Sequence, residues 1–353
     1  MNKEYNDNRE YNEALDSLRF SGEAKARMVQ GLMEAQEKPQ RRARRPLSRI
    51  AAVGIAAALV LSIGAGAAVV YNKLASESFA GVFGTAHTEI VDKIGKPIGA
   101  SATDNGVTIT AEAIIGDKYN YAMVYEIRRD DGTPFDLTGN EYGYLPLHFE
   151  DSSTDISYMG GSHGGSFFID ETPGDNVIQF VEMMSVDGEL KPGKAKASFQ
   201  NLKFNDGNED YTLIEGKWKF KFDFDFEDTS VSLPAGQTFD LNGMNAKIDR
   251  ITLSPLAVRV DYTVDSEVQW DDDAPSGREP EQNRRESQRY FESLPITLHK
   301  TDGTTMDLTN AGGSISPKNG KTECQKGKVF DQIMPVEEIA SITVGGIEIP
   351  VAQ

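Results

Sequence analysis

Cysteine is almost absent from this chain, because Cys324 is the only one among its 353 residues. No disulfide can form within the chain, so a secreted domain stapled by disulfides is excluded. The four histidines, His87, His148, His163 and His299, also lie far apart, and no H-x-x-x-H or H-E-x-x-H spacing offers a zinc site. No glycine loop of the phosphate-binding type precedes a helical pattern. We therefore expect no metal and no cofactor.

Two further patterns of chemical interest are weak. Gly160-Gly161-Ser162-His163-Gly164 has the G-x-S-x-G form of a nucleophile elbow, but no strand-to-helix turn is indicated around it. We expect a glycine-rich turn there; activity that disappears in a Ser162→Ala variant would be needed to support a hydrolase. The acidic loops 206–210 and 271–273 do not follow the twelve-residue calcium loop, so solvated turn charge is the favoured interpretation and calcium binding stays open. The sequence therefore predicts that the protein is not an enzyme.

A long uncharged apolar run is present at residues 50–71. Its 22 residues would give roughly 33 Å of helix, which matches the hydrocarbon core of a bilayer. A secretory signal cleaved near Ala65-Gly66-Ala67 is one alternative, and a buried soluble helix is another. The 49 preceding residues and the length of the run favour a retained transmembrane helix over a signal core of about 7 to 15 residues.

The charges beside this run predict its orientation. Five arginines precede it, Arg41, Arg42, Arg44, Arg45 and Arg49, whereas Lys73 stands nearly alone after it. Because positive charge stays on the cytoplasmic side, residues 1–49 should be cytoplasmic and the remainder extracellular. The net charge is +3 up to residue 49 and −22 from residue 72 onward, which together give −19. So acidic an outer part repels nucleic acid, which we do not expect as a partner.

The predicted cytoplasmic arm, residues 1–49, carries two apolar stripes at helical spacing. The first has Tyr11, Ala14, Leu15 and Leu18, and the second has Ala24, Met28, Val29, Leu32 and Met33. Helices this short are marginal alone in water. The stripes either pack on each other, lie on the inner leaflet of the bilayer, or enter a groove of a cytoplasmic partner. In the last case we expect six residues to make the contact: Leu15, Leu18, Met28, Val29, Leu32 and Met33.

The predicted outer part is mainly β. After a juxtamembrane segment, 72–98, with a helix expected over 77–94, alternating runs separated by Gly, Asp and Asn turns are typical of antiparallel sandwiches. These runs are VTITAEAII (107–115), YAMVYEI (121–127), VIQFVEMM (177–184), KWKFKFDFDF (217–226), AVRVDYTV (257–264) and ASITVGGIEI (340–349). We expect two tandem Ig-like β-sandwich domains, residues 99–228 and 229–353.

These two blocks look like copies of one plan. Residues 107–127 and 246–264 share a strand, turn and strand that end in an aromatic-rich strand, and LPLHF (145–149) and LPITLH (294–299) open the next part of each block. The pattern indicates an internal duplication. Residues 265–292 are then a polar insertion in the second block, either a binding surface or a tolerated excursion.

The arm sequence ALDSLRFSGEAKARMVQGLM (14–33), the arginine-flanked run and GASATDNGVTITAEAIIGDKYNYAMVYEI (99–127) together resemble a family of Gram-positive envelope proteins. The outer part of that family is catalogued as a domain of unknown function, and its members are commonly encoded beside extracytoplasmic-function sigma factors and treated as anti-sigma factors. The resemblance implies that the arm holds a sigma factor while the sandwiches face the cell wall. One departure is that the His-x-x-x-Cys-x-x-Cys zinc element of the best-known anti-sigma class is absent.

These observations together predict a single-pass protein of the cell membrane that acts in signal transduction and transcription regulation. Its arm would sequester a sigma factor, its outer domains would sense the state of the envelope through an unknown extracellular ligand or wall component, and its apolar run would contact the lipid bilayer. The alternative is a non-catalytic binding or adhesive envelope protein whose arm only anchors it. The double apolar stripe favours the first, because an anchor does not require it.

Overall fold

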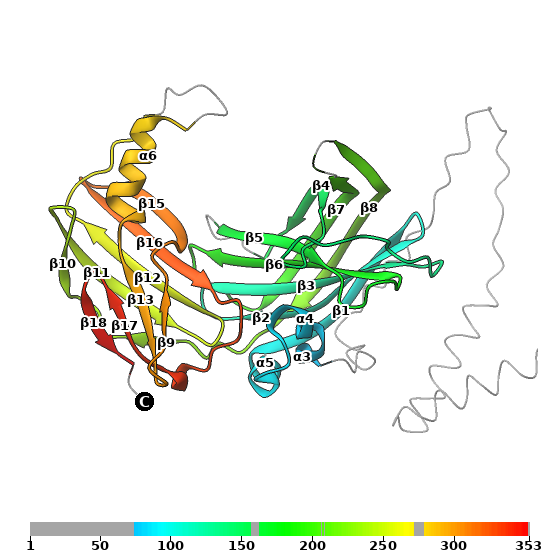
Figure 1. Cartoon of the computed structure of the whole chain (residues 1–353), viewed down its shortest axis with the longest axis horizontal. Coiled ribbons are helices and arrows are strands. Elements are labelled where there is room, and N and C mark those ends of the chain that lie inside the picture. The colour runs from blue at the N-terminus through cyan, green and yellow to red at the C-terminus, as the bar shows by residue number, and fades with distance from the viewer. Residues whose placement is uncertain (1–73, 157–161, 206, 208, 272–278, 352–353) are drawn as a thin grey trace, which may run out of the picture. The chain divides into compact units, whose positions relative to one another are not determined.

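The computed structural model describes residues 74–156, 162–205, 207, 209–271 and 279–351, which Figure 1 draws in colour. All of them belong to one compact unit, residues 56–353. This described part is mainly β and contains several antiparallel sheets, which confirms that much of the predicted fold class. Within the described ranges no helix has the length and apolar character needed to cross a membrane. The apolar run 50–71 and the arm 1–49 lie outside the described residues.

The first half of the described chain forms two sheets around one core. The five-stranded sheet has the order β1 (Gly95–Asp104), β2 (Val107–Gly116), β3 (Asn120–Arg129), β6 (Val177–Val186) and β5 (Ser162–Ile169). The three-stranded sheet has the order β4 (Leu147–Thr154), β7 (Gly193–Asn205) and β8 (Asp210–Phe224). Side chains of both sheets share the core around Tyr125, Phe199 and Trp218. We refer to these eight strands as the first repeat.

The alternating sequence of β8 explains how its strand is placed. Trp218, Phe220, Phe222 and Phe224 are buried in the core, while the intervening lysines and Asp223 are exposed. A period of two puts every second side chain on the same face of a strand. Trp218 is fully buried and its indole Nε1 donates to the carbonyl of Val107, 2.8 Å away, which fixes β8 against the opposite sheet.

The second half repeats this plan around its own core. One sheet runs β10 (Thr238–Leu241), β11 (Met244–Leu253), β12 (Ala257–Val264), β16 (Lys321–Val329) and β15 (Gly312–Lys318), with β9 (Val231–Leu233) paired to β11. The other runs β14 (Thr305–Asp307), β13 (Ile296–Lys300), β17 (Ile339–Val344) and β18 (Ile347–Pro350). Three short helical elements join these strands: α6 (Glu281–Ser287), the π-helix η1 (Gln288–Glu292) and the 3-10 helix η2 (Val336–Glu338). We refer to β9–β18 as the second repeat.

The two repeats agree strand by strand. The order β1-β2-β3-β6-β5 matches β10-β11-β12-β16-β15, and β4-β7-β8 matches β13-β17-β18, so that β9 and β14 are additions. The pairing of β2 with β3 is irregular between Ala111 and Ala113, and that of β11 with β12 is irregular between Ile248 and Arg250, at the same distance from the strand start. The repeated plan read from the sequence is therefore confirmed in the topology, and the LP elements do open equivalent strands, β4 and β13.

The segment before the first repeat differs from its prediction. Instead of one helix over 77–94, three short helices are present: α3 (Ala75–Ser78), α4 (Ala80–Phe83) and α5 (Thr88–Ile94). The prediction of one continuous helix is wrong because Gly84 and His87 both have positive φ, 73° and 57°, which a right-handed helix does not allow. The apolar spacing on either side of this break is still helical, and for that reason the break was missed.

Candidate functional site at the junction of the two repeats

The β2–β3 and β11–β12 hairpin turns occupy equivalent positions in the two repeats, and they contact each other. In the first turn the Asp117 carboxylate accepts from the amides of Tyr119 and Asn120, both at 2.8 Å. In the second turn the Ser254 hydroxyl accepts in the same way from the amides of Leu256 and Ala257. The Ser254 hydroxyl in turn donates to Asp117 at 2.5 Å. One hydrogen bond thus joins the same position of both repeats.

Asp117 is a buried carboxyl group, 2% exposed, at this contact. Burial raises its pKa above the ordinary value, and the hydrogen bonds from Ser254, Tyr119 and Asn120 oppose that rise. The side-chain amide of Asn120 also donates to it, and the Ser185 hydroxyl donates to the side-chain oxygen Oδ1 of Asn120 at 2.6 Å. Each of these polar groups depends on a partner within the junction, because a buried polar group without a hydrogen bond is costly.

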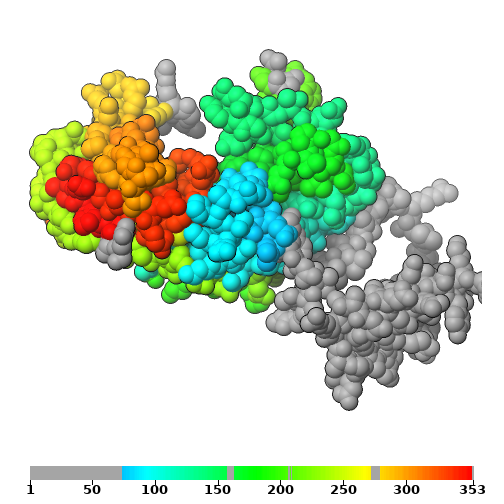
Figure 2. All heavy atoms as spheres, turned by 60° about the horizontal axis from the view of Figure 1, so that its bottom comes forward, coloured from blue at the N-terminus to red at the C-terminus, as the bar shows by residue number. Residues whose placement is uncertain are grey.

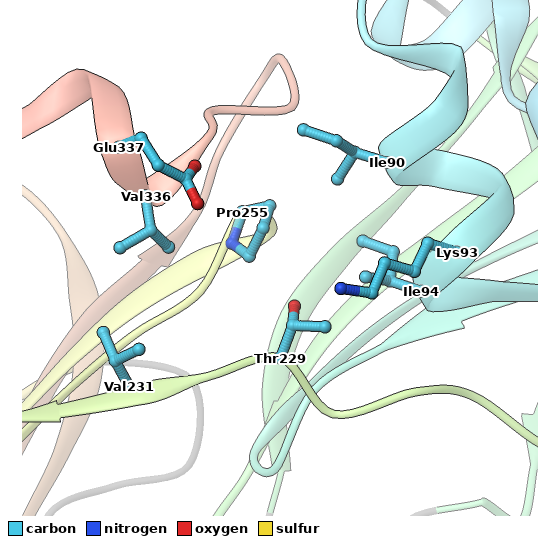
Figure 3. Close-up of a pocket in the computed structure, with 8 residues that line it drawn as sticks. All are labelled: Ile90, Lys93, Ile94, Thr229, Val231, Pro255, Val336 and Glu337. Carbon is cyan, nitrogen blue, oxygen red and sulfur yellow. The ribbon is translucent and has the colours of Figure 1, made fainter. Parts of the chain in front are cut away.

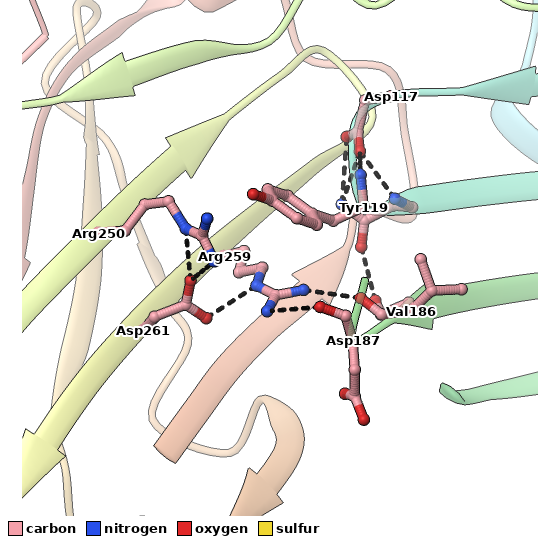
Figure 4. Close-up of polar contacts among 9 residues, drawn as sticks. Asp117, Tyr119, Val186, Asp187, Arg250, Arg259 and Asp261 are labelled. Carbon is pink, nitrogen blue, oxygen red and sulfur yellow. Dashed lines mark hydrogen bonds and ion pairs between the residues drawn. The ribbon is translucent and has the colours of Figure 1, made fainter. Parts of the chain in front are cut away.

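Arg259 of β12 provides the second connection between the repeats, and Figure 4 shows its contacts. Its guanidinium donates to the carbonyl of Val186, the last residue of β6 in the first repeat, at 2.7 Å, and to that of the next residue, Asp187, at 3.4 Å. Its Nε donates to the Asp261 carboxylate at 2.8 Å. Because the Arg259 side chain is only 6% exposed, this charge is held in place by neighbours from both repeats.

A stacked aromatic ring completes the cluster. Tyr119 leads out of the first hairpin turn, and the guanidinium of Arg259 lies 4.2 Å from its ring centroid (Figure 4). Arg250 lies 4.7 Å from the same centroid and pairs with Asp261 at 2.6 Å. A guanidinium within about 6 Å of an aromatic ring is attracted by its quadrupole. Two cations, one carboxylate and one ring thus bind the first repeat to β11 and β12.

The helices α3 to α5 pack on the same region. They share a third core with the outward-facing side of β2, β3 and β6 and with residues of the second repeat. Its buried members are Ala75, Phe79, Phe83, Val91, Ile94, Ala113, Ile115, Ala122, Val124, Ile169, Val181, Leu256, Ala257 and Ile333. Figure 2 shows the helices in blue next to the green first repeat and the red surface of the second. The segment that follows the apolar run is therefore buried against both repeats.

A cavity of about 310 Å³ lies beside this third core (Figure 3). It is bounded by α5, by the connection between the repeats and by two loops of the second repeat, with the residues Ile90, Lys93, Ile94, Thr229, Val231, Pro255, Val336 and Glu337. Lys93 and Glu337 are its only charged side chains. Its volume is at the lower end of the range for small-molecule sites, so a small ligand would fit. The lining residues include no convergent set of catalytic groups.

No chemical centre is found within the described ranges. They hold no group of three or more His, Cys, Asp or Glu that could bind a metal. Ser162 to Gly164 lie in β5, paired with β6, so the glycine-rich turn expected for these three residues is wrong, and the strand-to-helix turn of a nucleophile elbow is absent there. Cys324 is buried, and burial raises the pKa of its thiol to about 12, which makes it a poor nucleophile.

The predicted partner-binding residues, Leu15, Leu18, Met28, Val29, Leu32 and Met33, lie outside the described residues. So do Asp206 and the larger part of the acidic loop 271–273. The structure instead brings together Asp117, Tyr119, Ser254 and Arg259, none of which is a predicted site residue. One signal was available: each turn carries a side chain, Asp or Ser, that caps the next backbone amides.

Part of the chain, residues 47–129, resembles known proteins at the level of sequence. Residues 47–129 match the family described as a domain of unknown function (DUF4179). The predicted resemblance is confirmed to this extent, and the matched residues include both the apolar run and the first hairpin of the junction. A conserved domain protein from Bacillus anthracis, known from its crystal structure, is 15% identical, with a TM-score of 0.42 over 71% of this chain and 76% of that one. No curated protein matches the chain.

Proposed function

We propose that this chain is a single-pass membrane signalling protein that acts as an anti-sigma factor. Residues 1–49 face the cytoplasm, residues 50–71 span the bilayer, and the two repeats form tandem Ig-like sandwich domains outside. The five arginines before the apolar run and the net charge of −22 beyond it support this orientation. The family match to residues 47–129 adds that the run and the first hairpin belong to one recurring unit.

The observation that carries the proposal is the burial of α3 to α5 in the third core. Phe79, Phe83 and Ile94 are at most 4% exposed, and their core includes Leu256 and Ile333 of the second repeat. A ligand or force that shifts the repeats against each other must disturb this packing, because close-packed cores do not deform continuously. The disturbance would reach the segment directly after the apolar run. A conformational change in the repeats would in this way be transmitted to the helices next to the proposed membrane span.

On the inner side, the mechanism is sequestration by the two apolar stripes of the arm. Leu15 and Leu18 from the first stripe and Met28, Val29, Leu32 and Met33 from the second would enter a groove of the sigma factor. The arm would bind the sigma factor more weakly, or release it, when the outer domains change state. The alternative is an envelope protein that binds a wall component and uses its arm only as an anchor. In that case the stripes would have no protein partner.

Affinity capture tests this function. The tagged full chain, extracted in a non-ionic detergent from its own cells, should recover a sigma subunit. Alanine at Leu15, Leu18, Leu32 and Met33 should abolish recovery, because buried anchors typically cost 1 to 2 kcal/mol or more each. Alanine at Ser17 and Gln30, beside the stripes on the same arm, serves as the matched control and should leave recovery unchanged.

Recovery of no sigma subunit by the full chain would contradict the proposal and favour the anchored binding protein. Equal recovery by the stripe variant and the control would contradict the assigned contacts. A reporter for the genes of the captured sigma factor gives a second measurement: it should rise in the stripe variant and stay low in the control.

A further inference from the structure

The strands β7 and β8 are neighbours in the first repeat (Figure 1). Four exposed lysines lie on their outer face. Lys217, Lys219 and Lys221 alternate along β8 with buried aromatic residues, so all three point away from the core and are exposed. On β7, Lys196 is exposed and stands directly opposite Lys221. We refer to these four side chains as the lysine row. It stands in an outer part whose net charge is −22.

The four side chains of the lysine row form no ion pair among the described residues, whereas the other two lysines of β7 and β8 each form one. Lys194 pairs with Asp223 across the strands, and Lys203 pairs with Glu150 at 3.8 Å. Within the described part, no carboxylate lies within ion-pair distance of Lys196, Lys217, Lys219 or Lys221. Like charges directly opposite each other destabilise a sheet, so the pairing of Lys196 with Lys221 costs stability.

The fold does not require this row. The equivalent strands of the second repeat, β17 and β18, contain no lysine at all. Charged residues on an edge strand commonly protect against aggregation, and β8 is the edge strand of its sheet, which accounts for single lysines on it. It does not account for a fourth lysine on the inner neighbour β7 that faces one of them. A ligand of opposite charge does account for it, because it would turn the repulsion into binding energy.

The spacing indicates the shape of that ligand. Alternate residues on a strand lie roughly 6.8 Å apart, and opposite residues about 5 Å apart, so the row is about 14 Å long and narrow. Exposed carboxylates flank it on the same face, Asp151 on β4 opposite Gln200 and Asp223 at the end of β8. A broad anionic surface would meet those carboxylates as well. Between Lys217 and Lys221 the exposed positions of β8 are all lysines, so a single chain lying along this short stretch would meet three cations in a row.

We infer that the lysine row binds a linear, base-free polyanion with phosphodiester-like charges along its length. A single-stranded nucleic acid has charges of similar spacing, but it binds by stacking its bases on aromatic side chains. Trp218, Phe220 and Phe222 all point inward on β8 and offer no such platform. The assignment of this polymer to the cell envelope rests on the proposed function. The presence of the charged surface does not depend on that function.

The test uses the full chain in a non-ionic detergent and fluorescein-labelled synthetic poly(glycerol phosphate), with binding followed by anisotropy. Release of counterions from about four contacts predicts that the affinity falls about 50-fold between 50 and 200 mM salt. The variant K196Q/K217Q/K219Q/K221Q should bind at least about tenfold more weakly at 50 mM salt and lose most of this salt dependence.

The control variant K247Q/K318Q/K321Q/K328Q removes the same number of positive charges from ion-paired lysines of the second repeat. It should bind like the unmodified chain. Equal loss in both variants, or loss in neither, would overturn the inference. So would stronger row-dependent binding to oligothymidylate or to phosphatidylglycerol vesicles than to the polymer. A cooperative thermal unfolding transition in each variant shows that both are folded.

This outcome is independent of sigma-factor capture. The lysine row lies in the described first repeat, and the capture test depends on the arm. Failure of polymer binding leaves the anti-sigma function standing, and failure of sigma capture leaves the polymer-binding surface standing.

Discussion

Removal of the Arg259 guanidinium should uncouple the two repeats. In the Arg259→Ala variant the carbonyls of Val186 and Asp187 lose their donor from the second repeat, and the Tyr119 ring loses a cation at 4.2 Å. Asp261 keeps its pair with Arg250 at 2.6 Å, so no carboxylate is left buried alone. The change therefore acts mainly on the contact between the repeats.

The magnitude follows from these contacts. A hydrogen bond from a charged donor contributes about 1.5 to 3 kcal/mol, and here the bond to Val186 is short while that to Asp187 is long. The lost cation–π contact adds about 1 kcal/mol in a desolvated place. We expect the free energy of unfolding to fall by about 3 kcal/mol, which lowers the midpoint of thermal unfolding by roughly 5 °C for a unit of this size.

The two tryptophans allow a direct assay. Trp218 lies in the core of the first repeat and Trp270 packs against the core of the second. In a Trp270→Phe background, fluorescence reports unfolding of the first repeat, while far-UV circular dichroism reports both. The two signals should coincide in the parent protein and separate after Arg259→Ala, since coincident transitions indicate one cooperative unit.

Arg250→Ala is the matched control. The substitution removes a guanidinium from the same carboxylate and the same ring. Unlike Arg259, the Arg250 side chain donates no hydrogen bond to the first repeat, and it is 43% exposed. We expect a loss of about 1 kcal/mol and coincident signals. Coincident transitions in Arg259→Ala, or already separate transitions in the parent, would refute the reasoning that Arg259 couples the repeats.

Three further changes have defined outcomes. Burial raises the pKa of Glu182 to about 7, so the folded state holds a proton that the unfolded state releases above about pH 4.5; stability is lost as the pH rises through that window. Glu182→Gln should therefore gain at most about 3 kcal/mol relative to the parent between pH 4 and 8 in denaturant titrations, and a pH-independent difference would contradict this. Cys324, with its pKa raised to about 12, should react with a thiol reagent at pH 8 only as the protein unfolds; rapid labelling of the native protein would count against its burial. Gly345→Ala should cost about 2 to 4 kcal/mol, because φ is +55° and the new methyl group meets the Phe239 ring, whereas Gly346→Ala, with positive φ and open space, should cost about 1 kcal/mol.

The β strands were predictable because their information is local. The period of two in KWKFKFDFDF and in VTITAEAII reflects which side chains face a core. The second run lies in β2, and the first lies in β8 up to Phe224. The repeated plan was also visible, because the LP elements and the aromatic-rich hairpins recur in the same order.

The junction was not predictable in the same way. Asp117 and Ser254 are 137 residues apart, and nothing local shows that two hairpin turns meet. Arg259 looks like an ordinary exposed strand residue in AVRVDYTV, yet it is buried by Val186 and Tyr119 of the other repeat. The break in the expected helix over 77–94 depends on two positive φ values, of which only Gly84 has a residue type that favours one.

The central claim is that the arm and the two repeats lie on opposite sides of a membrane. In a Cys324→Ser background, Ser17→Cys places a thiol in the arm and Lys191→Cys places one at an exposed position of the first repeat. A membrane-impermeant maleimide applied to intact cells should label the Lys191→Cys chain at once and the Ser17→Cys chain only after permeabilisation. Labelling of the Ser17→Cys chain in intact cells, or a mature chain that lacks residue 17, would contradict the account.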